Sequence, residues 1–155
     1  MSDQQPVIKC DSVYKIFGKN AEKMLQNANG KVVAEEFQKA GCVVGVNNAS
    51  FEVNKGEMLV VMGLSGSGKS TLLRCISRLT DATAGNIYID GEDLLALNSK
   101  ELIELRRNKM GMVFQSFALL PHKTVLENIA FPLQVKGSST KDSITRAMEM
   151  VELVG

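Results

Sequence analysis

The chain has 155 residues, of which 45% are hydrophobic and 23% charged; this ordinary balance for one soluble globular domain excludes a disordered polypeptide. Its 18 lysines and arginines nearly balance 17 aspartates and glutamates, and the net charge of +1 gives no electrostatic footprint for nucleic acid or an acidic membrane surface. We therefore expect its partners to recognise shape and local contacts.

The cysteines and the apolar runs indicate the compartment. Cys10, Cys42 and Cys75 are widely spaced and form no CxxC pair, which favours buried thiols in a reducing compartment over a zinc site. The longest apolar run, residues 58–64, is far shorter than the roughly 20 residues that a membrane span needs, and no signal-peptide pattern is evident. We expect a cytosolic chain unless another subunit brings it to a membrane.

The first third of the chain predicts a small, mostly antiparallel sheet with a helical insertion. Residues 7–16 are rich in β-forming side chains and predict a strand, whereas the polar, alanine-containing residues 19–41 predict one or two short helices. Two short strands are expected at 43–46 and 49–53, and Asn54 to Glu57 supply a turn.

Residues 63–70 read GLSGSGKS, a complete GxxxxGK[ST] phosphate-binding loop, or P-loop. Residues 58–62 predict a buried strand before the loop, and an amphipathic helix is expected after it from the spacing of Leu72, Leu73, Ile76 and Leu79. The glycines let successive backbone N–H groups converge on a phosphate at the positive end of the helix. The sequence therefore predicts a site for a nucleotide triphosphate.

Each polar side chain of the loop has an expected task. Lys69 is placed to reach the β and γ phosphates, Ser70 to hold Mg²⁺ through its hydroxyl, and Thr71 to bond a phosphate oxygen. The predicted site comprises Gly63, Leu64, Ser65, Gly66, Ser67, Gly68, Lys69, Ser70 and Thr71.

The second half alternates strands and helices. A strand is expected at 86–90, a helix capped by Asn98 or Ser99 that runs to about Lys109, and an apolar strand at 111–115. Thr124 and Glu127 form a TxxE capping box, and the helix that it opens should end at Phe131 before Pro132. After the polar connection KGSSTK, a last helix presents Ile144, Ala147, Met148 and Val151 on one face.

Gln115 follows an apolar strand and begins the run QSFALLPHKTVLENI, which resembles the Q-loop of ATP-binding cassette (ABC) transporter ATPases. The resemblance extends through residues 44–94 and 110–133, close to half the chain. Within that superfamily, the insertion at 19–41 together with MGLSGSGKSTL and FQSFALLPH looks most like the ATPase of glycine betaine and proline importers. The fold that this implies is α/β: a P-loop core with an N-terminal antiparallel β subdomain.

The resemblance also assigns residues to the chemistry. It implies ATP and Mg²⁺ as ligands, with Gln115 contacting the metal and the attacking water while Lys69 holds the phosphates. In the family an aromatic side chain near the end of the first strand stacks on adenine, and Phe17 is the matching position, with Tyr14 as the alternative. Either ring could instead be a core aromatic of the sheet. His122 lies outside the position of the family's switch histidine, so we assign it no catalytic role.

The implied partners are the membrane-spanning permease subunits of an importer and a second ATP-binding subunit, at the cytoplasmic face of the cell membrane. The permease contact is expected at Ser116–His122, where Phe117, Leu119 and Leu120 would lie exposed on a loop; the alternative is that they pack within their own subdomain. No nucleic-acid partner is expected.

By this resemblance the chain is the N-terminal part of one ABC ATP-binding domain. Residues 1–57 are its antiparallel β subdomain, 58–115 its P-loop core, and 116–155 its Q-loop and the start of a helical subdomain. The sequence contains no LSGGQ segment, no Walker B strand ending in Asp-Glu and no switch histidine, so we expect these residues alone to hydrolyse ATP orders of magnitude more slowly. We also expect 58–62 and 112–114 to keep apolar surface without a neighbour.

Two other classes of protein remain as alternatives. A non-catalytic nucleotide-binding or interaction module would fit the absent hydrolysis residues. A P-loop GTPase or small-molecule kinase is remote, because the run from Asn108 to Gly111 lacks the guanine-reading aspartate and Arg106-Arg107 is a poor match to a kinase lid.

Overall fold

The computed structural model describes residues 5–114 and 119–155, and the chain forms two compact units, one up to Arg106 and one from Arg107 onward. The first unit contains a four-stranded sheet, the helical insertion and the P-loop with its helix. The second contains a pair of helices that pack on each other. The three-part domain division expected from the sequence stays a prediction.

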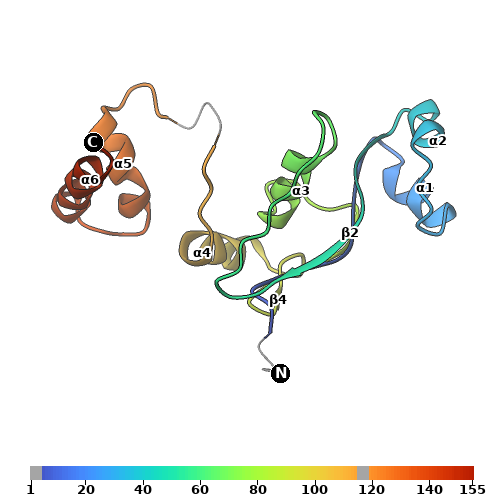
Figure 1. Cartoon of the computed structure of the whole chain (residues 1–155), viewed down its shortest axis with the longest axis horizontal. Coiled ribbons are helices and arrows are strands. Elements are labelled where there is room, and N and C mark those ends of the chain that lie inside the picture. Colours follow the sequence, from blue (N-terminus) through green and yellow to red (C-terminus); the bar gives the residue numbers. More distant parts are fainter. Residues whose placement is uncertain (1–4, 115–118) are drawn as a thin grey trace. The chain divides into compact units, whose positions relative to one another are not determined.

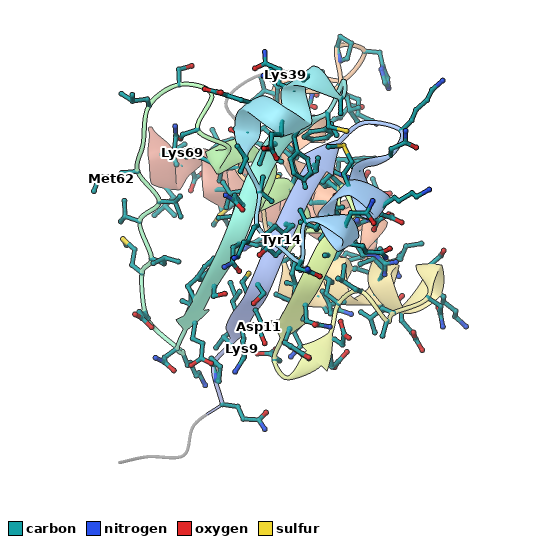
Figure 2. All side chains as sticks on the ribbon, turned by 90° about the vertical axis from the view of Figure 1, so that its right-hand side faces the viewer. Lys9, Asp11, Tyr14, Lys39, Met62 and Lys69 are labelled. Atoms are coloured by element: carbon teal, nitrogen blue, oxygen red, sulfur yellow. The ribbon has the colours of Figure 1, made fainter. Side chains whose placement is uncertain are left out.

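The sheet has the order β2-β1-β3-β4, and every neighbouring pair is antiparallel. Its strands are β1 (Ile8–Phe17), β2 (Val43–Val53), β3 (Ala84–Ile89) and β4 (Glu92–Asp93). The sequence prediction of a small antiparallel sheet is therefore confirmed (Figure 1), and β1 is an inner strand that lies between β2 and β3 (Figure 2).

The two short strands expected at 43–46 and 49–53 are one strand, β2, with an irregularity between them. Asn48 has a φ of +50°, and the register of β1 against β2 shifts between the Val13 and Lys15 pairings. A single residue in the left-handed region bends a strand without ending its ladder, as in a β-bulge.

The insertion is two short helices, α1 (Ala21–Asn27) and α2 (Ala34–Lys39), as expected. They bury a local hydrophobic cluster at one end of the sheet, with Phe37 only 2% exposed. Packing of the cluster rather than helix length holds these helices in place, because helices this short are unstable alone. Its buried members are Ile16, Ala21, Leu25, Phe37 and Cys42.

The helix after the P-loop is α3 (Lys69–Ile76), and it contacts β1 and β2. Leu72 and Cys75, three residues apart, are its buried side chains. This confirms the amphipathic helix that the apolar spacing predicts, although Leu73 and Leu79 are each 53% exposed.

The expected strands at 58–62 and 111–115 are wrong for the residues described. Residues 58–62 and 111–114 belong to no strand or helix, and Met58, Met62 and Val113 are 86%, 84% and 100% exposed. Figure 2 shows Met62 on a segment that runs outside the sheet, with its side chain turned away from it. An apolar sequence forms a strand only when a neighbouring strand satisfies its N–H and C=O groups, and no described segment does so here.

The remaining helices are α4 (Ser99–Lys109), α5 (Val125–Val135) and α6 (Thr140–Val154). The Asn98 side chain accepts bonds from the N–H groups of Lys100 and Glu101, as an N-cap should. The expected end of α5 at Phe131 is wrong, because the helix continues through Pro132. Packing of α5 on α6, with Ala130 fully buried, offsets the one hydrogen bond that a proline removes.

The predicted capping box opens α5. Thr124 Oγ1 accepts a 3.2 Å bond from the Glu127 N–H, and Glu127 Oε2 accepts bonds from the Thr124 N–H at 2.7 Å and its hydroxyl at 2.9 Å. These hydrogen bonds from the Thr124 backbone and side chain lower the pKa of Glu127 below its ordinary value of 4.5.

Within residues 5–114 and 119–155, no helix combines the length and the apolar character needed to cross a bilayer.

We expect the 155-residue polypeptide alone to be marginally stable and to self-associate, because its unpaired segment at 58–62 exposes contiguous apolar side chains. Replacing Val60 and Met62, which are 63% and 84% exposed, by lysine should reduce self-association and the binding of a hydrophobic dye. Sedimentation and dye fluorescence measure both effects. Replacing the exposed Gln26 and Gln38 by lysine adds the same charge elsewhere and is the control. A sharp cooperative melt of a soluble wild-type monomer would contradict the expectation.

Removing the capping box should loosen α5. Thr124→Ala is expected to cost about 1 kcal/mol of local stability, measured by hydrogen exchange at the α5 amides.

The capping box should also make the stability of α5 depend on pH. Because the pKa of Glu127 is lowered in the folded state, the contribution of Glu127 to stability is complete above pH 4.5 and is lost as the pH falls through the folded value. Glu127→Gln should remove this acid dependence, and an unchanged acid response in that variant would exclude Glu127 as its source.

Candidate functional site

The P-loop runs directly into the N-terminus of α3. Gly68 is the N-cap residue, with a φ of +90° in the left-handed region, and its carbonyl accepts the first helical bond from the Leu72 N–H at 2.8 Å. Gly66 also has a positive φ, of +80°. Only glycine adopts such angles freely, which is why the loop needs glycine at these positions.

Lys69 folds back over its own loop. Its ammonium donates to the carbonyls of Gly63 at 2.8 Å and Leu64 at 2.7 Å, and to Ser67 Oγ at 3.3 Å. An ammonium has three donors, so these bonds hold it across the loop opening. The same donors can turn to phosphate oxygens, with which a cation forms stronger, charge-assisted bonds.

One backbone contact attaches the loop to the sheet. A Cβ placed on Gly68 would lie 1.9 Å from the carbonyl oxygen of Gly45 in β2, which no side chain could tolerate. At Gly45 itself, a Cβ would lie 2.9 Å from the Phe17 ring and 3.0 Å from the Thr71 methyl group. The loop, α3 and the end of β1 therefore meet at a point where two glycines leave no room for side chains.

Phe17 and the P-loop line one hollow of about 230 Å³. The Phe17 side chain is 44% exposed, and the Lys15 ammonium lies 5.0 Å from its ring centroid. The other residues that line the hollow are Val43, Val44, Gly45, Gly66, Gly68, Lys69, Ser70 and Thr71.

Tyr14, the alternative for base stacking, belongs to a different environment. Its hydroxyl donates to the Gly30 carbonyl at 3.2 Å, and its ring packs against the hydrophobic cluster of the insertion. It lines a second hollow with α1 residues rather than the one beside the P-loop. The role of either ring toward a nucleotide stays a prediction, but the structure places only Phe17 among the loop residues.

The described side chains around the loop could hold Mg²⁺ only together with bound phosphates. Among the described residues, no group of three or more His, Cys, Asp or Glu side chains could hold a metal ion. Ser70 offers a single hydroxyl in the first turn of α3. Mg²⁺ prefers phosphate oxygens and waters with only one or two protein ligands, so it would enter this site with the phosphates.

Cys10 in β1 and Cys75 in α3 are both buried. Burial raises the pKa of Cys10 to about 12, and it raises the pKa of Cys75 in α3, against the opposing charge of Lys15. Both are therefore protonated at neutral pH and act as small hydrophobic side chains. This agrees with the reading of the cysteines as structural.

Gln115 and the first part of the predicted contact segment, up to Ala118, lie outside the described residues. Beyond them Leu119 is 74% exposed, as expected, whereas Leu120 is half-buried. His122 is exposed.

Sequence reasoning missed the side chain that organises the loop before α5. Asn128 accepts a 2.7 Å bond from the Leu120 N–H and donates to the carbonyls of Leu120, Lys123 and Thr124 at 3.2, 3.1 and 2.9 Å. An asparagine in the first turn of a capped helix is the only signal that the sequence offered. It also missed Gly45, whose need for glycine comes from tertiary neighbours.

With this geometry established, comparison with known proteins identifies the family. The family model described as ABC transporter matches residues 46–155. The chain belongs to the ABC transporter family. The solved dimeric structure of MJ0796, a bacterial ABC transporter cassette, superimposes with a TM-score of 0.74 at 33% identity, over 94% of this chain and 56% of that chain.

Curated relatives narrow the resemblance within this ABC family. The chain is 82% identical over its whole length to the trimethylamine N-oxide transport system ATP-binding protein TmoW of Pelagibacter ubique, of which it spans 45%. It is 50% identical to the glycine betaine transport ATP-binding protein OpuAA of Bacillus subtilis and 40% identical to ProV of Escherichia coli, spanning 37% of each. The chain thus covers less than half the length of these relatives.

The contact between Gly68 and Gly45 predicts a sharp difference between two glycines. Gly68→Ala should weaken triphosphate binding roughly tenfold or more, because both its φ of +90° and the Gly45 carbonyl oppose a side chain. Gly56→Ala is the matched control, since Gly56 has a φ of +80° but no atom within 4 Å of an added Cβ. Titration with Mg-ATP measures both variants, and equal losses would show that the contact with β2 is not needed.

Proposed function

We propose that this chain forms the nucleotide-binding part of the ATP-binding subunit of an ABC importer for small methylated amine osmolytes. The observation that carries the proposal is the 230 Å³ hollow where Lys69, the first turn of α3 and Phe17 meet. Its Lys69 side suits the phosphates of ATP, and its Phe17 side suits the adenine base. The substrate class comes from the names of the relatives, which are ATP-binding proteins of trimethylamine N-oxide transport and of glycine betaine transport.

ATP would bind by exchange of hydrogen bonds at Lys69. Its ammonium leaves the carbonyls of Gly63 and Leu64 for phosphate oxygens, while the backbone N–H groups of the loop and the N-terminus of α3 attract the same charge. Bound Mg²⁺ would supply neutralisation of the phosphate charge, with the Ser70 hydroxyl among its ligands. Thr71, which follows Ser70 in the first turn of α3, would bond a phosphate oxygen.

Phe17 would hold the other end of the nucleotide. Its half-exposed ring lies beside Gly45 and Thr71, so a base stacked on it keeps the phosphates within reach of the loop. Stacking on an aromatic ring is worth about 1 kcal/mol. Gln115 is proposed to contact Mg²⁺ and the attacking water on the basis of the family resemblance.

Two protein partners are proposed. The segment Ser116–His122, with Leu119 exposed, would dock on membrane-spanning permease subunits, which would hold the chain at the cytoplasmic face of the membrane as a peripheral protein. A second ATP-binding subunit would complete the site, consistent with the dimeric structure of MJ0796.

Replacing the lysine of the loop tests the function. In the complete gene product, Lys69→Ala should weaken Mg-ATP binding by roughly tenfold or more and abolish ATP-driven uptake of labelled trimethylamine N-oxide or glycine betaine. Lys55→Ala, at an exposed turn before the loop, is the control and should leave both unchanged. Normal hydrolysis and uptake by Lys69→Ala would refute the proposal.

A phosphate-release assay beside the nucleotide titration separates the importer subunit from a binding module. Binding with turnover supports the proposed energy-coupling subunit. Binding without turnover, and without uptake, in the complete gene product would favour a non-catalytic nucleotide-binding module instead.

A further inference from the structure

The end of β1 carries an arrangement that the P-loop motif does not explain. Lys15 and Phe17 are two residues apart, and the Lys15 ammonium lies over the Phe17 ring, 5.0 Å from its centroid. This is within the roughly 6 Å at which a cation is attracted to the face of an aromatic ring. One face of the ring is therefore occupied by the protein's own cation.

The Lys15 side chain is half-buried rather than a free surface lysine. Its positive charge opposes the rise that burial causes in the pKa of Cys75, a fully buried residue of α3, so the ammonium is near enough to the P-loop helix to interact with it. A lysine in such a place loses side-chain entropy and hydration, and the ring is the partner that compensates for this loss.

Hydrogen bonds on both sides fix the backbone next to Phe17. Pairing of β1 with β3 ends at Tyr14, and beyond it Thr83 Oγ1 replaces the ladder by accepting from the Ile16 N–H at 2.9 Å and donating to the Ile16 carbonyl at 3.2 Å. The residue before Phe17 is thus held on the β3 side by a side chain and on the β2 side by its pairing with Val44. With the neighbouring backbone fixed in this way, the remaining freedom of Phe17 is the rotation of its side chain.

We propose that Lys15 is a positioning residue for the nucleobase, because its ammonium covers one face of Phe17 and holds the other face ready to stack on the base. The proposal rests on the proposed nucleotide binding and extends it to a residue outside the P-loop. Lys15 acts through Phe17 in two ways. It restricts the rotation of a ring that is 44% exposed, and it draws electron density from the ring face that meets an electron-rich purine.

The test compares a whole nucleotide with its phosphates alone, in the complete gene product. Lys15→Met keeps the length of the side chain and removes the charge, and it should weaken Mg-ATP binding about threefold to fivefold while leaving binding of inorganic tripolyphosphate unchanged. Lys15→Arg should restore ATP affinity, since guanidinium also binds ring faces. Lys23→Met, at an exposed lysine of α1, is the matched control and should change neither ligand.

A double-mutant cycle distinguishes action through the ring from simple attraction of charge. In a Phe17→Leu background, Lys15→Met should cause no further loss of ATP affinity. Equal weakening of ATP and tripolyphosphate, or a full additional loss in the Phe17→Leu background, would overturn the proposal while leaving nucleotide binding intact. A wild-type protein that binds neither ligand would refute the proposed function itself, and this inference with it.

Discussion

The position of the phosphate-binding loop depends on the close approach of two backbone segments, Gly68 at the start of α3 and the Gly45 carbonyl in β2. A Cβ at position 68 would lie 1.9 Å from that oxygen, so the contact exists only because position 68 has no side chain. Since α3 begins at the next residue, the same contact locates the helix N-terminus whose N–H groups face a phosphate. The site is therefore built on the antiparallel sheet, while residues 58–62 that enter the loop have no strand partner among the described residues.

The far end of α3 is held by two arginines. Arg78 donates to the carbonyls of Leu94 and Leu97 at 2.9 and 2.7 Å, and Arg106 of α4 donates to those of Ser77 and Arg78 at 3.0 and 2.6 Å. Cationic donors are favourable at a helix C-terminus, where carbonyls lack partners and the dipole is negative. With both ends held, α3 is a rigid support for the loop although it has only eight residues.

The two parts of the hollow come from sequence segments about fifty residues apart. Phe17 lies at the end of β1, and Lys69 and Ser70 open α3, yet they line one surface because α3 contacts both β1 and β2. The helical insertion contributes indirectly. Its cluster buries Ile16, the residue before Phe17, and so anchors the end of the strand. Lys15 and Thr83 complete that anchoring with a cation and a hydroxyl.

The amino-acid sequence by itself determined the features that depend on neighbours along the chain. The amphipathic helix after the P-loop, the Thr124–Glu127 capping box and the antiparallel first third all follow from local spacing, and the structure confirms them. The P-loop motif is equally local, and its binding of phosphate stays a prediction. The same local reasoning was wrong at 58–62 and 111–114, because an apolar run becomes a strand only when another strand pairs with it. It was also wrong at Pro132, where packing of α5 on α6 outweighs one lost hydrogen bond.

Only the tertiary structure decided which residues surround the loop. It placed Phe17 rather than Tyr14 beside Lys69, set Gly45 where no side chain fits, and brought Lys15 over the Phe17 ring. Asn128 and Thr83 gained their roles in the same way, by bonding backbone groups that the secondary structure leaves unpaired. The spacing of residues along the chain predicts the local structure of one segment. The positions of these side chains depend instead on how β1, β2 and α3 pack, and that packing is the sum of contacts between segments far apart in the chain.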